Sequence, residues 1–147
     1  MVKIILFYNM NTIKPVSCGF FIYRKNNNNE TELLMVKGIT SGKWGPPKGR
    51  NVPNEKYIET ALREVKEEIG IDLSNYINMK NIRYVKAQKY IMYRYYFNDY
   101  MSNNIDIKLQ KSELLEYKWF NVKDLNNIIK ENPDSFINLI RNIRNVF

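Results

Sequence analysis

The chain has 147 residues, of which 44% are hydrophobic and 26% are charged, a composition typical of globular proteins, so we expect a single domain over residues 1–147. No apolar run is long enough to cross a bilayer and residues 1–8 lack the features of a signal peptide, which predicts an intracellular, cytoplasmic protein with no membrane partner. The net charge of +8 suits a polyanionic partner such as a nucleotide or an RNA 5′ end, although basic surfaces without that role are as frequent.

Two further residue counts restrict the chemistry. Cys18 is the single cysteine, which excludes an internal disulfide and a multi-cysteine zinc site, and its expected place is a buried position on a strand. The chain contains no histidine, which excludes histidine bases and imidazole metal ligands. Catalysis would therefore depend on carboxylates, lysines, tyrosines or a hard metal ion such as Mg²⁺ or Mn²⁺.

The first third of the chain has the hydrophobic alternation of a β-sheet. The predicted strands are residues 3–8, 16–24 and 32–37, and the predicted turn lies at residues 26–29. Residues 41–54 contain three glycines and three prolines, which predicts a loop. Trp44 is available to anchor this loop against the core.

The period of the apolar residues changes at Glu55, where a helix of about four turns is predicted. The residues at helical spacing are Ile58, Ala61, Leu62, Val65 and Ile69. Gly70 would end this helix as a C-cap glycine.

In the second half, predicted strands are followed by predicted helices. Residues 82–97 form a long β-branched and aromatic tract, which predicts one long strand or two strands with a bend, and residues 117–121 predict another strand. Amphipathic helices are predicted at residues 122–130 and 135–146, the second with Asp134 as N-cap. The second helix would bury Phe136, Leu139, Ile140 and Ile143. The element order predicts an α/β (α+β) fold with a mixed sheet.

Three glutamates lie on one face of the first predicted helix. Glu64 is three residues from Glu67 and four from Glu68, and this spacing places the three carboxylates side by side. Like charges at this spacing repel each other unless a cation neutralises them. A solvated acidic face, balanced by Arg63 and Lys66, is the alternative and is favoured when only the charges are considered.

The residues around these glutamates reverse that judgement. They match every specified position of the pattern G-x5-E-x7-R-E-U-x-E-E-x-G-U, in which U is a large aliphatic residue. The matching residues are Gly49, Glu55, Arg63, Glu64, Val65, Glu67, Glu68, Gly70 and Ile71. This pattern is the Nudix box, and the chain therefore resembles the Nudix hydrolase family.

The resemblance implies a mixed sheet between helices and a hydrolase that cleaves a phosphoanhydride bond in a nucleoside diphosphate linked to another group. The implied ligands of Mg²⁺ or Mn²⁺ are Glu64, Glu67 and Glu68. Arg63 would orient one of these ligands, while Glu55 and Gly70 would support the geometry of the loop and helix.

A further catalytic or metal-binding glutamate is expected outside the box. Several branches of the family have such a residue in a loop just before a strand, and Glu113, six residues before Trp119, has a similar place. An exposed loop acid is the alternative role for Glu113. Glu116 is the competing candidate.

The segment before the box bears on the substrate. Residues 44–50 read Trp-Gly-Pro-Pro-Lys-Gly-Arg, which combines stiff prolines, glycines that permit close contact with phosphates, and two cations. We expect Lys48, Gly49 and Arg50 to bind substrate. Trp44 would either contact substrate or anchor the loop on the core.

Two branches of the family have a similar segment. The mRNA-decapping enzymes have Trp-Gly-Phe-Pro-Lys-Gly before a basic residue, often after a strand ending in Val-Lys-Gly, as residues 36–38 read here. Asymmetric diadenosine tetraphosphate hydrolases have Trp-Thr-Pro-Pro-Lys-Gly-His and then Pro-Gly-Glu, where residues 53–55 read Pro-Asn-Glu. These differences and the charge favour the 5′ cap or 5′ phosphates of RNA as the substrate. A dinucleoside polyphosphate is the alternative, and a non-catalytic nucleotide- or RNA-binding module is a third possibility.

Tyrosines and basic residues are interspersed in residues 82–97, and they could stack a base and hold phosphates. Alternation along one strand would place Tyr84, Tyr90 and Tyr96 on one face and Tyr93 and Tyr95 on the other. A core face and a solvated sheet face are the simpler explanation.

Overall fold

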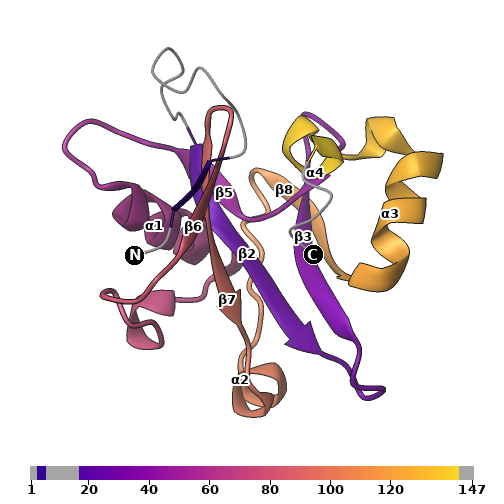
Figure 1. Cartoon of the computed structure of the whole chain (residues 1–147), viewed down its shortest axis with the longest axis horizontal. Coiled ribbons are helices and arrows are strands. Elements are labelled where there is room, and N and C mark those ends of the chain that lie inside the picture. The colour runs from indigo at the N-terminus through magenta and orange to yellow at the C-terminus, as the bar shows by residue number, and fades with distance from the viewer. Residues whose placement is uncertain (1–2, 6–16, 143–147) are drawn as a thin grey trace.

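The computed structural model of the protein describes residues 3–5 and 17–142 (Figure 1). The strands are β1 (Lys3–Ile5), β2 (Ser17–Lys25), β3 (Thr31–Gly38), β4 (Trp44–Gly45), β5 (Lys48–Arg50), β6 (Tyr84–Ala87), β7 (Tyr90–Tyr96) and β8 (Leu114–Asn121). The α-helices are α1 (Tyr57–Ile69), α2 (Asp99–Asn104), α3 (Val122–Glu131) and α4 (Asn138–Asn142), and short 3₁₀ helices lie at Leu73–Asn75 and Pro133–Ser135. Over the described ranges, no helix has the length and apolar character that a membrane crossing requires.

Strand β2 lies at the centre of one mixed sheet. It pairs in parallel with β7 and antiparallel with β3 and β5, and the strand order is β1-β6-β7-β2-β3-β4, with β8 also pairing with β3. Residues 18–23 of β2 are all buried, which is typical of a strand that is covered on both faces. The mixed α+β fold class is therefore confirmed, and Cys18 is buried on a strand as predicted.

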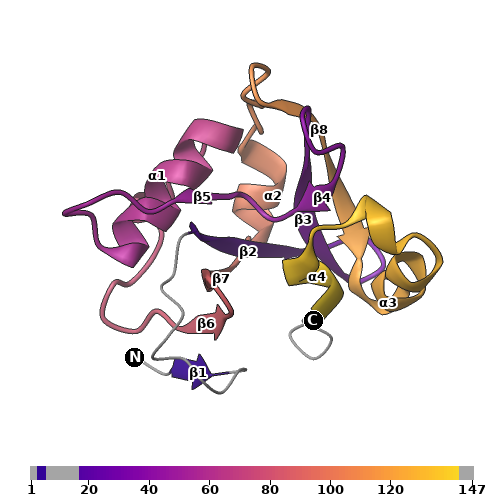
Figure 2. The same ribbon diagram turned by 90° about the horizontal axis from the view of Figure 1, so that it is seen from above.

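Each face of the sheet has its own hydrophobic core. The core on one face joins β2 to the box helix α1 and contains Cys18, Phe20, Ile22, Ala61, Val65 and Ile69. The core on the other face joins β3 to α3 and α4 and contains Leu33, Met35, Leu125, Phe136, Leu139 and Ile140. Figure 2 shows α1 well separated from the pair α3 and α4. The sheet thus lies between the box helix and the C-terminal helices.

Helix α1 begins and ends at local signals in the sequence. The Glu59 carboxylate accepts a hydrogen bond of 2.9 Å from the Lys56 backbone N–H, which satisfies a donor at the first turn. At the other end Gly70 has φ of 75° and donates its N–H to the Lys66 carbonyl oxygen, so Gly70 is the C-cap that the sequence predicts. The helix begins at Tyr57, two residues after the predicted start at Glu55.

Two predicted segments differ in their details. The predicted loop at 41–54 contains strands β4 and β5, because its extended backbone pairs with β3 and β2. Residues 82–97 form the antiparallel strands β6 and β7, joined by a tight turn at Gln88, which has φ of 51°.

The tight turn changes which tyrosines share a face. Tyr84 pairs with Tyr93 across the two strands, and side chains of a directly opposed pair point to the same face. The prediction that Tyr84 shares a face with Tyr90 and Tyr96 is therefore wrong. A turn between two strands restarts the alternation that the prediction followed through a single strand.

The C-terminal region departs most from prediction. The predicted helix at 135–146 is a 3₁₀ helix at Pro133–Ser135, a β-bridge between Phe136 and Trp44, and then α4. Asp134 lies inside the 3₁₀ helix and is not the N-cap of α4. The Ile137 N–H donates to the Trp44 carbonyl oxygen at 3.1 Å, and this pairing holds the chain extended where a helix was expected.

Smaller differences concern strand ends and one missed helix. Strand β8 begins at Leu114, before the predicted start at 117, and α2 was not predicted. Of the predicted strand at 3–8, residues 3–5 form β1, while 6–8, together with Val16 and Ile143, lie outside the described residues.

Candidate active site

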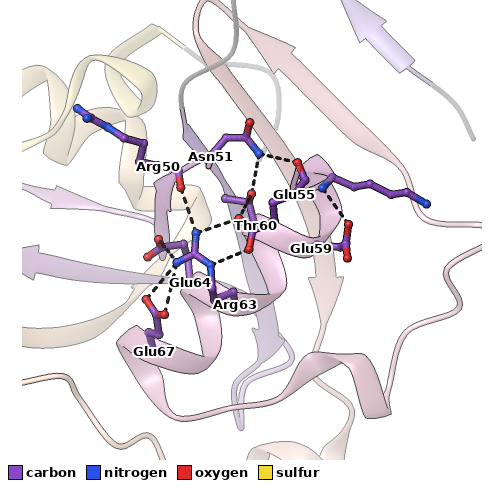
Figure 3. Close-up of polar contacts among 9 residues, drawn as sticks. Arg50, Asn51, Glu55, Glu59, Thr60, Arg63, Glu64 and Glu67 are labelled. Atoms are coloured by element: carbon purple, nitrogen blue, oxygen red, sulfur yellow. Dashed lines mark hydrogen bonds and ion pairs between the residues drawn. The ribbon is translucent and has the colours of Figure 1, made fainter. Parts of the chain in front are cut away.

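The guanidinium of Arg63 is the centre of a polar network on α1 (Figure 3). Its Nε and Nη2 donate to the two carboxylate oxygens of Glu55 at 2.9 and 3.0 Å. Its Nη1 donates to Glu64 Oε1 at 2.8 Å and lies 3.3 Å from Glu67 Oε2. Its Nη2 also donates to the Arg50 carbonyl oxygen at 3.1 Å. One side chain therefore ties the segment before the helix to two carboxylates on it.

Glu55 is held in place by a second set of contacts. Thr60 Oγ1 donates to Glu55 Oε1 at 2.5 Å, and Asn51 Nδ2 donates to the Glu55 carbonyl oxygen at 3.0 Å and to Thr60 Oγ1 at 2.8 Å. The hydrogen bonds from Arg63, followed by that from Thr60, lower the pKa of the Glu55 carboxyl to about 2. Charge-assisted hydrogen bonds of this kind are roughly twice as strong as neutral ones.

Gly49 permits a close approach between β5 and α1. A Cβ atom at this position would overlap the Glu64 carboxylate, so a larger residue would displace that side chain. Burial raises the pKa of Glu64, while the hydrogen bond from Arg63 opposes the rise. Gly49 is thus required by the position of Glu64, whatever further role it has toward substrate.

Glu68 is a buried carboxylate with 8% of its surface exposed. Its Oε2 accepts a hydrogen bond of 3.2 Å from the Lys48 backbone N–H. Burial, reinforced by the negative charge of Glu64, raises the pKa of Glu68 to about 8, although the Lys48 charge opposes this rise. Glu68 borders a pocket of about 100 Å³ whose other lining residues include Val36, Pro46, Lys48, Leu114 and Ile137.

The segment between α2 and β8 lies against the C-terminal end of α1. The Gln110 N–H donates to the Glu68 carbonyl oxygen and the Lys108 N–H to the Ile69 carbonyl oxygen, each at 2.9 Å. These bonds satisfy carbonyl groups that a helix end leaves without intrahelical partners. They also bring the approach to β8 next to the box.

Glu113 follows this segment and lies within electrostatic range of the box. Its negative charge contributes to the raised pKa of both Glu64 and Glu68, and its carbonyl oxygen accepts from the Ile39 N–H at 3.0 Å. Glu116 is exposed on β8, where it pairs with Lys37 of β3. Of the two candidates outside the box, Glu113 is the one with an electrostatic effect on the box carboxylates.

Lys48 is the cation whose charge acts most directly on the buried carboxylate of Glu68. Burial lowers the pKa of its ammonium, the Glu68 charge opposes this and the Lys89 charge adds to it. The ammonium nitrogens of Lys48 and Lys89 lie 5.6 and 5.8 Å from the ring centre of Tyr90. This cluster was only partly anticipated, because the strand pairing that brings Lys89 and Tyr90 to Lys48 is not visible in the sequence.

The other two residues predicted to bind substrate have different surroundings. Arg50 is exposed and supplies its carbonyl oxygen to Arg63. Trp44 is half-buried, its ring centre lies 5.2 Å from that of Phe120, and the Lys37 ammonium lies 5.7 Å from it. These contacts support the anchoring role for Trp44, and its contact with substrate stays a prediction.

The carboxylates around Glu68 supply oxygen donors that suit Mg²⁺ or Mn²⁺. Burial and the Glu64 charge both disfavour the charged form of Glu68, and a bound divalent cation would relieve both effects. Among residues 3–5 and 17–142, no three acidic side chains converge closely enough to hold an ion as they stand. Arg63 holds Glu64 and Glu67. The Glu67 side chain is 47% exposed, which leaves it room to rotate, and a rotation would move its carboxylate oxygens relative to those of Glu64 and Glu68.

Comparison with known proteins determines the family. The model of the NUDIX domain matches residues 15–140. The chain belongs to the Nudix family. Bis(5′-nucleosyl)-tetraphosphatase (asymmetrical) of Mus musculus is 31% identical over 118 residues, which cover 74% of this chain and 80% of the mouse protein. The mRNA-decapping enzyme subunit 2 of Saccharomyces cerevisiae is 31% identical over 102 residues, which cover 67% of this chain and 10% of the yeast protein.

Solved structures agree with this assignment. The crystal structure of a C. elegans Ap4A hydrolase binary complex is 25% identical, has a TM-score of 0.55, and covers 82% of this chain and 88% of that chain. The Nudix chain is therefore a pyrophosphohydrolase of this family, as the complete box predicts, and a non-catalytic binding module is not supported.

Acid should destabilise the Nudix fold through Glu55. Because its folded-state pKa of about 2 lies below the ordinary value of 4.5, ionised Glu55 stabilises the fold above about pH 4.5, and this contribution is lost as the pH falls toward 2. Urea unfolding should show that, between about pH 6 and about pH 3, the free energy of unfolding falls by about 1–2 kcal/mol more in the wild type than in Glu55→Gln. Glu131→Gln, which changes an exposed acid, should follow the wild type. An equal loss in wild type and Glu55→Gln would contradict the assignment.

Proposed function

We propose that this Nudix hydrolase cleaves a dinucleoside polyphosphate, with Mg²⁺ or Mn²⁺ as the cofactor. The observation that carries the proposal is the extent of the match to the asymmetric tetraphosphatases, which covers most of both chains. The mouse enzyme is matched over 80% of its length, and the C. elegans Ap4A hydrolase structure over 88%. The expectation from the sequence placed an RNA 5′ end first, and the extent of these matches reverses that order.

The proposed metal site uses the carboxylates gathered at the C-terminal half of α1. The residues that would hold the ion are Glu64, Glu67 and Glu68, and Glu113 would act beside them as the base. When bound, the metal would neutralise charge on the phosphate oxygens and lower the pKa of the attacking water. Arg63 has a positioning role, because it fixes Glu64 and Glu67 without being one of the ligands.

The remaining steps use groups of the chain itself. Lys48 and Arg50 bind phosphate oxygens, and the backbone at Gly49 allows the polyphosphate to come close to Glu64. The water oxygen attacks a phosphorus, the proton passes to the Glu113 carboxylate, and the bond from that phosphorus to the bridging oxygen breaks. The leaving phosphate takes the electron pair, so no covalent intermediate is required.

A capped or 5′-phosphorylated RNA is the second candidate substrate. It is supported by the similarity to the yeast decapping subunit and by the net charge of +8. Gly45 and Arg50 also support it, because they match the glycine and the basic residue of the decapping segment. The same phosphate-binding and metal-binding groups would serve either substrate. The cytoplasmic location and the single domain over 1–147 also stay predictions.

The role of Glu113 can be separated from that of Glu116, an acid three residues further along the chain. Replacing Glu113 by Gln removes the proposed base and should lower kcat by about a hundredfold. The matched variant Glu116→Gln should retain kcat within about twofold. Both acids are exposed, but only the Glu113 charge is among those that raise the pKa of Glu64 and Glu68, so the change at Glu116 removes a surface charge away from the site. Steady-state kinetics with circular dichroism as a folding control measure both effects. Equal losses in the two variants would contradict the assignment of Glu113.

A side-by-side assay identifies the substrate. The purified chain with Mg²⁺ should hydrolyse diadenosine tetraphosphate to ATP and AMP faster than it hydrolyses capped RNA, nucleoside triphosphates, ADP-ribose or diphosphoinositol phosphates. Reaction in ¹⁸O-labelled water followed by mass spectrometry of the products identifies the phosphorus attacked. Preferential release of a capped nucleoside diphosphate would favour the RNA substrate. Turnover of another substrate, with neither diadenosine tetraphosphate nor capped RNA hydrolysed, would contradict both candidates.

A further inference from the structure

A second pocket lies between helices α3 and α4, in the layer that covers the face of the sheet opposite α1. Its volume is about 700 Å³, which is within the range typical of small-ligand sites. It is lined by Asn126, Asn127, Ile129, Lys130, Pro133, Asn138, Ile140 and Arg141. None of these residues belongs to the Nudix box, and in Figures 1 and 2 α3 and α4 lie well apart from α1.

The charged residues of this pocket are of one sign. Lys130 and Arg141 are cationic, and no acidic residue is among those that line the pocket. The Arg141 Nε is removed from solvent and has no hydrogen-bond partner among the residues that the structure describes. Burying a donor without an acceptor is unfavourable, so a turn of the Arg141 side chain toward an anionic oxygen in the pocket would satisfy an existing need of the fold.

The neutral polar residues suit a ligand with more than a phosphate group. Asn126, Asn127 and Asn138 each offer a carboxamide that can donate and accept hydrogen bonds. Carboxamides pair with the edges of bases, most often adenine, and with sugar hydroxyls. Ile129, which is half-buried, adds apolar surface on which a ring could pack.

The shape of the site favours a small molecule over a nucleic-acid strand. A strand would need a groove that continues for several nucleotides, with cations along it. Here the two cations and three carboxamides surround one local volume between two helices. A single nucleotide can therefore reach both kinds of group.

We propose that this pocket is a second, non-catalytic binding site for a mononucleotide. Its phosphate would contact the Arg141 guanidinium and the Lys130 ammonium, and the carboxamides would contact the sugar and base. The inference does not depend on which substrate the hydrolytic site takes. It adds a nucleotide site on the side of the sheet opposite the Nudix box.

The test uses the full chain and AMP as the probe, with a chelator present so that the box carboxylates hold no divalent cation and repel the phosphate. In ¹H–¹⁵N spectra AMP should shift the side-chain amide signals of Asn126, Asn127 and Asn138. Arg141→Gln and Lys130→Gln should each weaken AMP binding about tenfold. Lys80→Gln, which removes an equal charge from an exposed turn, should bind AMP as the wild type does.

Ligand controls separate the parts of the proposal. Adenosine and inorganic phosphate should each bind more weakly than AMP, because each lacks one half of the contacts. Shifts confined to Gly49 and α1 would overturn the site. So would an AMP affinity that is unchanged both in Lys130→Gln and in an Arg141→Gln variant that is folded. Inorganic phosphate that binds as tightly as AMP would contradict a nucleotide site. An oligonucleotide whose affinity rises with its length would contradict a mononucleotide and favour a strand.

Discussion

The five-donor guanidinium of Arg63 is the constraint on which the site depends. Its planar fork fits the Glu55 carboxylate in two parallel hydrogen bonds, and its remaining donors reach Glu64, Glu67 and the Arg50 carbonyl oxygen. A lysine could not make these contacts together, because its ammonium is a compact point charge. Since Glu55 is itself held by Thr60 and Asn51, the carboxylates of α1 are positioned by a chain of hydrogen bonds that begins in the preceding loop.

A second constraint is the concentration of negative charge at one end of this helix. Glu68 is buried, Glu64 is partly buried, and Glu113 adds its charge to both. Arg63 is engaged mainly with Glu55 and Glu64, and burial lowers the pKa of Lys48. The fold thus accepts an electrostatic cost at this place, and such costs are concentrated where proteins bind ions or substrates. The Nudix assignment gives that cost a physical reason.

Local patterns predicted the parts of the structure that local interactions decide. The box register predicted α1 and its C-cap at Gly70, and the uninterrupted apolar run predicted β2. The failures occur where distant segments pair. Trp44 holds Phe136 and Ile137 in an extended conformation, so the helix that the apolar spacing favours begins only at Asn138. Likewise, the turn at Gln88 moves Tyr84 to the face of Tyr93.

The candidate site likewise contains residues that the sequence identifies and residues that it does not. The motif identifies the glutamates and Arg63, but Asn51 and Thr60 occupy unspecified positions of the box, so no sequence signal marks them as the residues that fix Glu55. The approach of Gln110 to Glu68 and of Lys89 and Tyr90 to Lys48 depends on tertiary pairing. The spacing of the motif residues along the chain predicted the chemistry of the site. The packing of separate segments determined the surroundings of those residues.

The central claim is that the buried carboxylate of Glu68, together with Glu64 and Glu67, which Arg63 holds, forms a divalent-metal site. Calorimetric titration of Mn²⁺ or Mg²⁺ into the wild-type chain and into Glu68→Gln tests it directly, since the substitution keeps the shape of the side chain and removes its charge. Glu59→Gln, on the first turn of the same helix, is the matched control. The account predicts metal binding by the wild type and Glu59→Gln and its loss in folded Glu68→Gln. Equal metal affinity in all three proteins would contradict it.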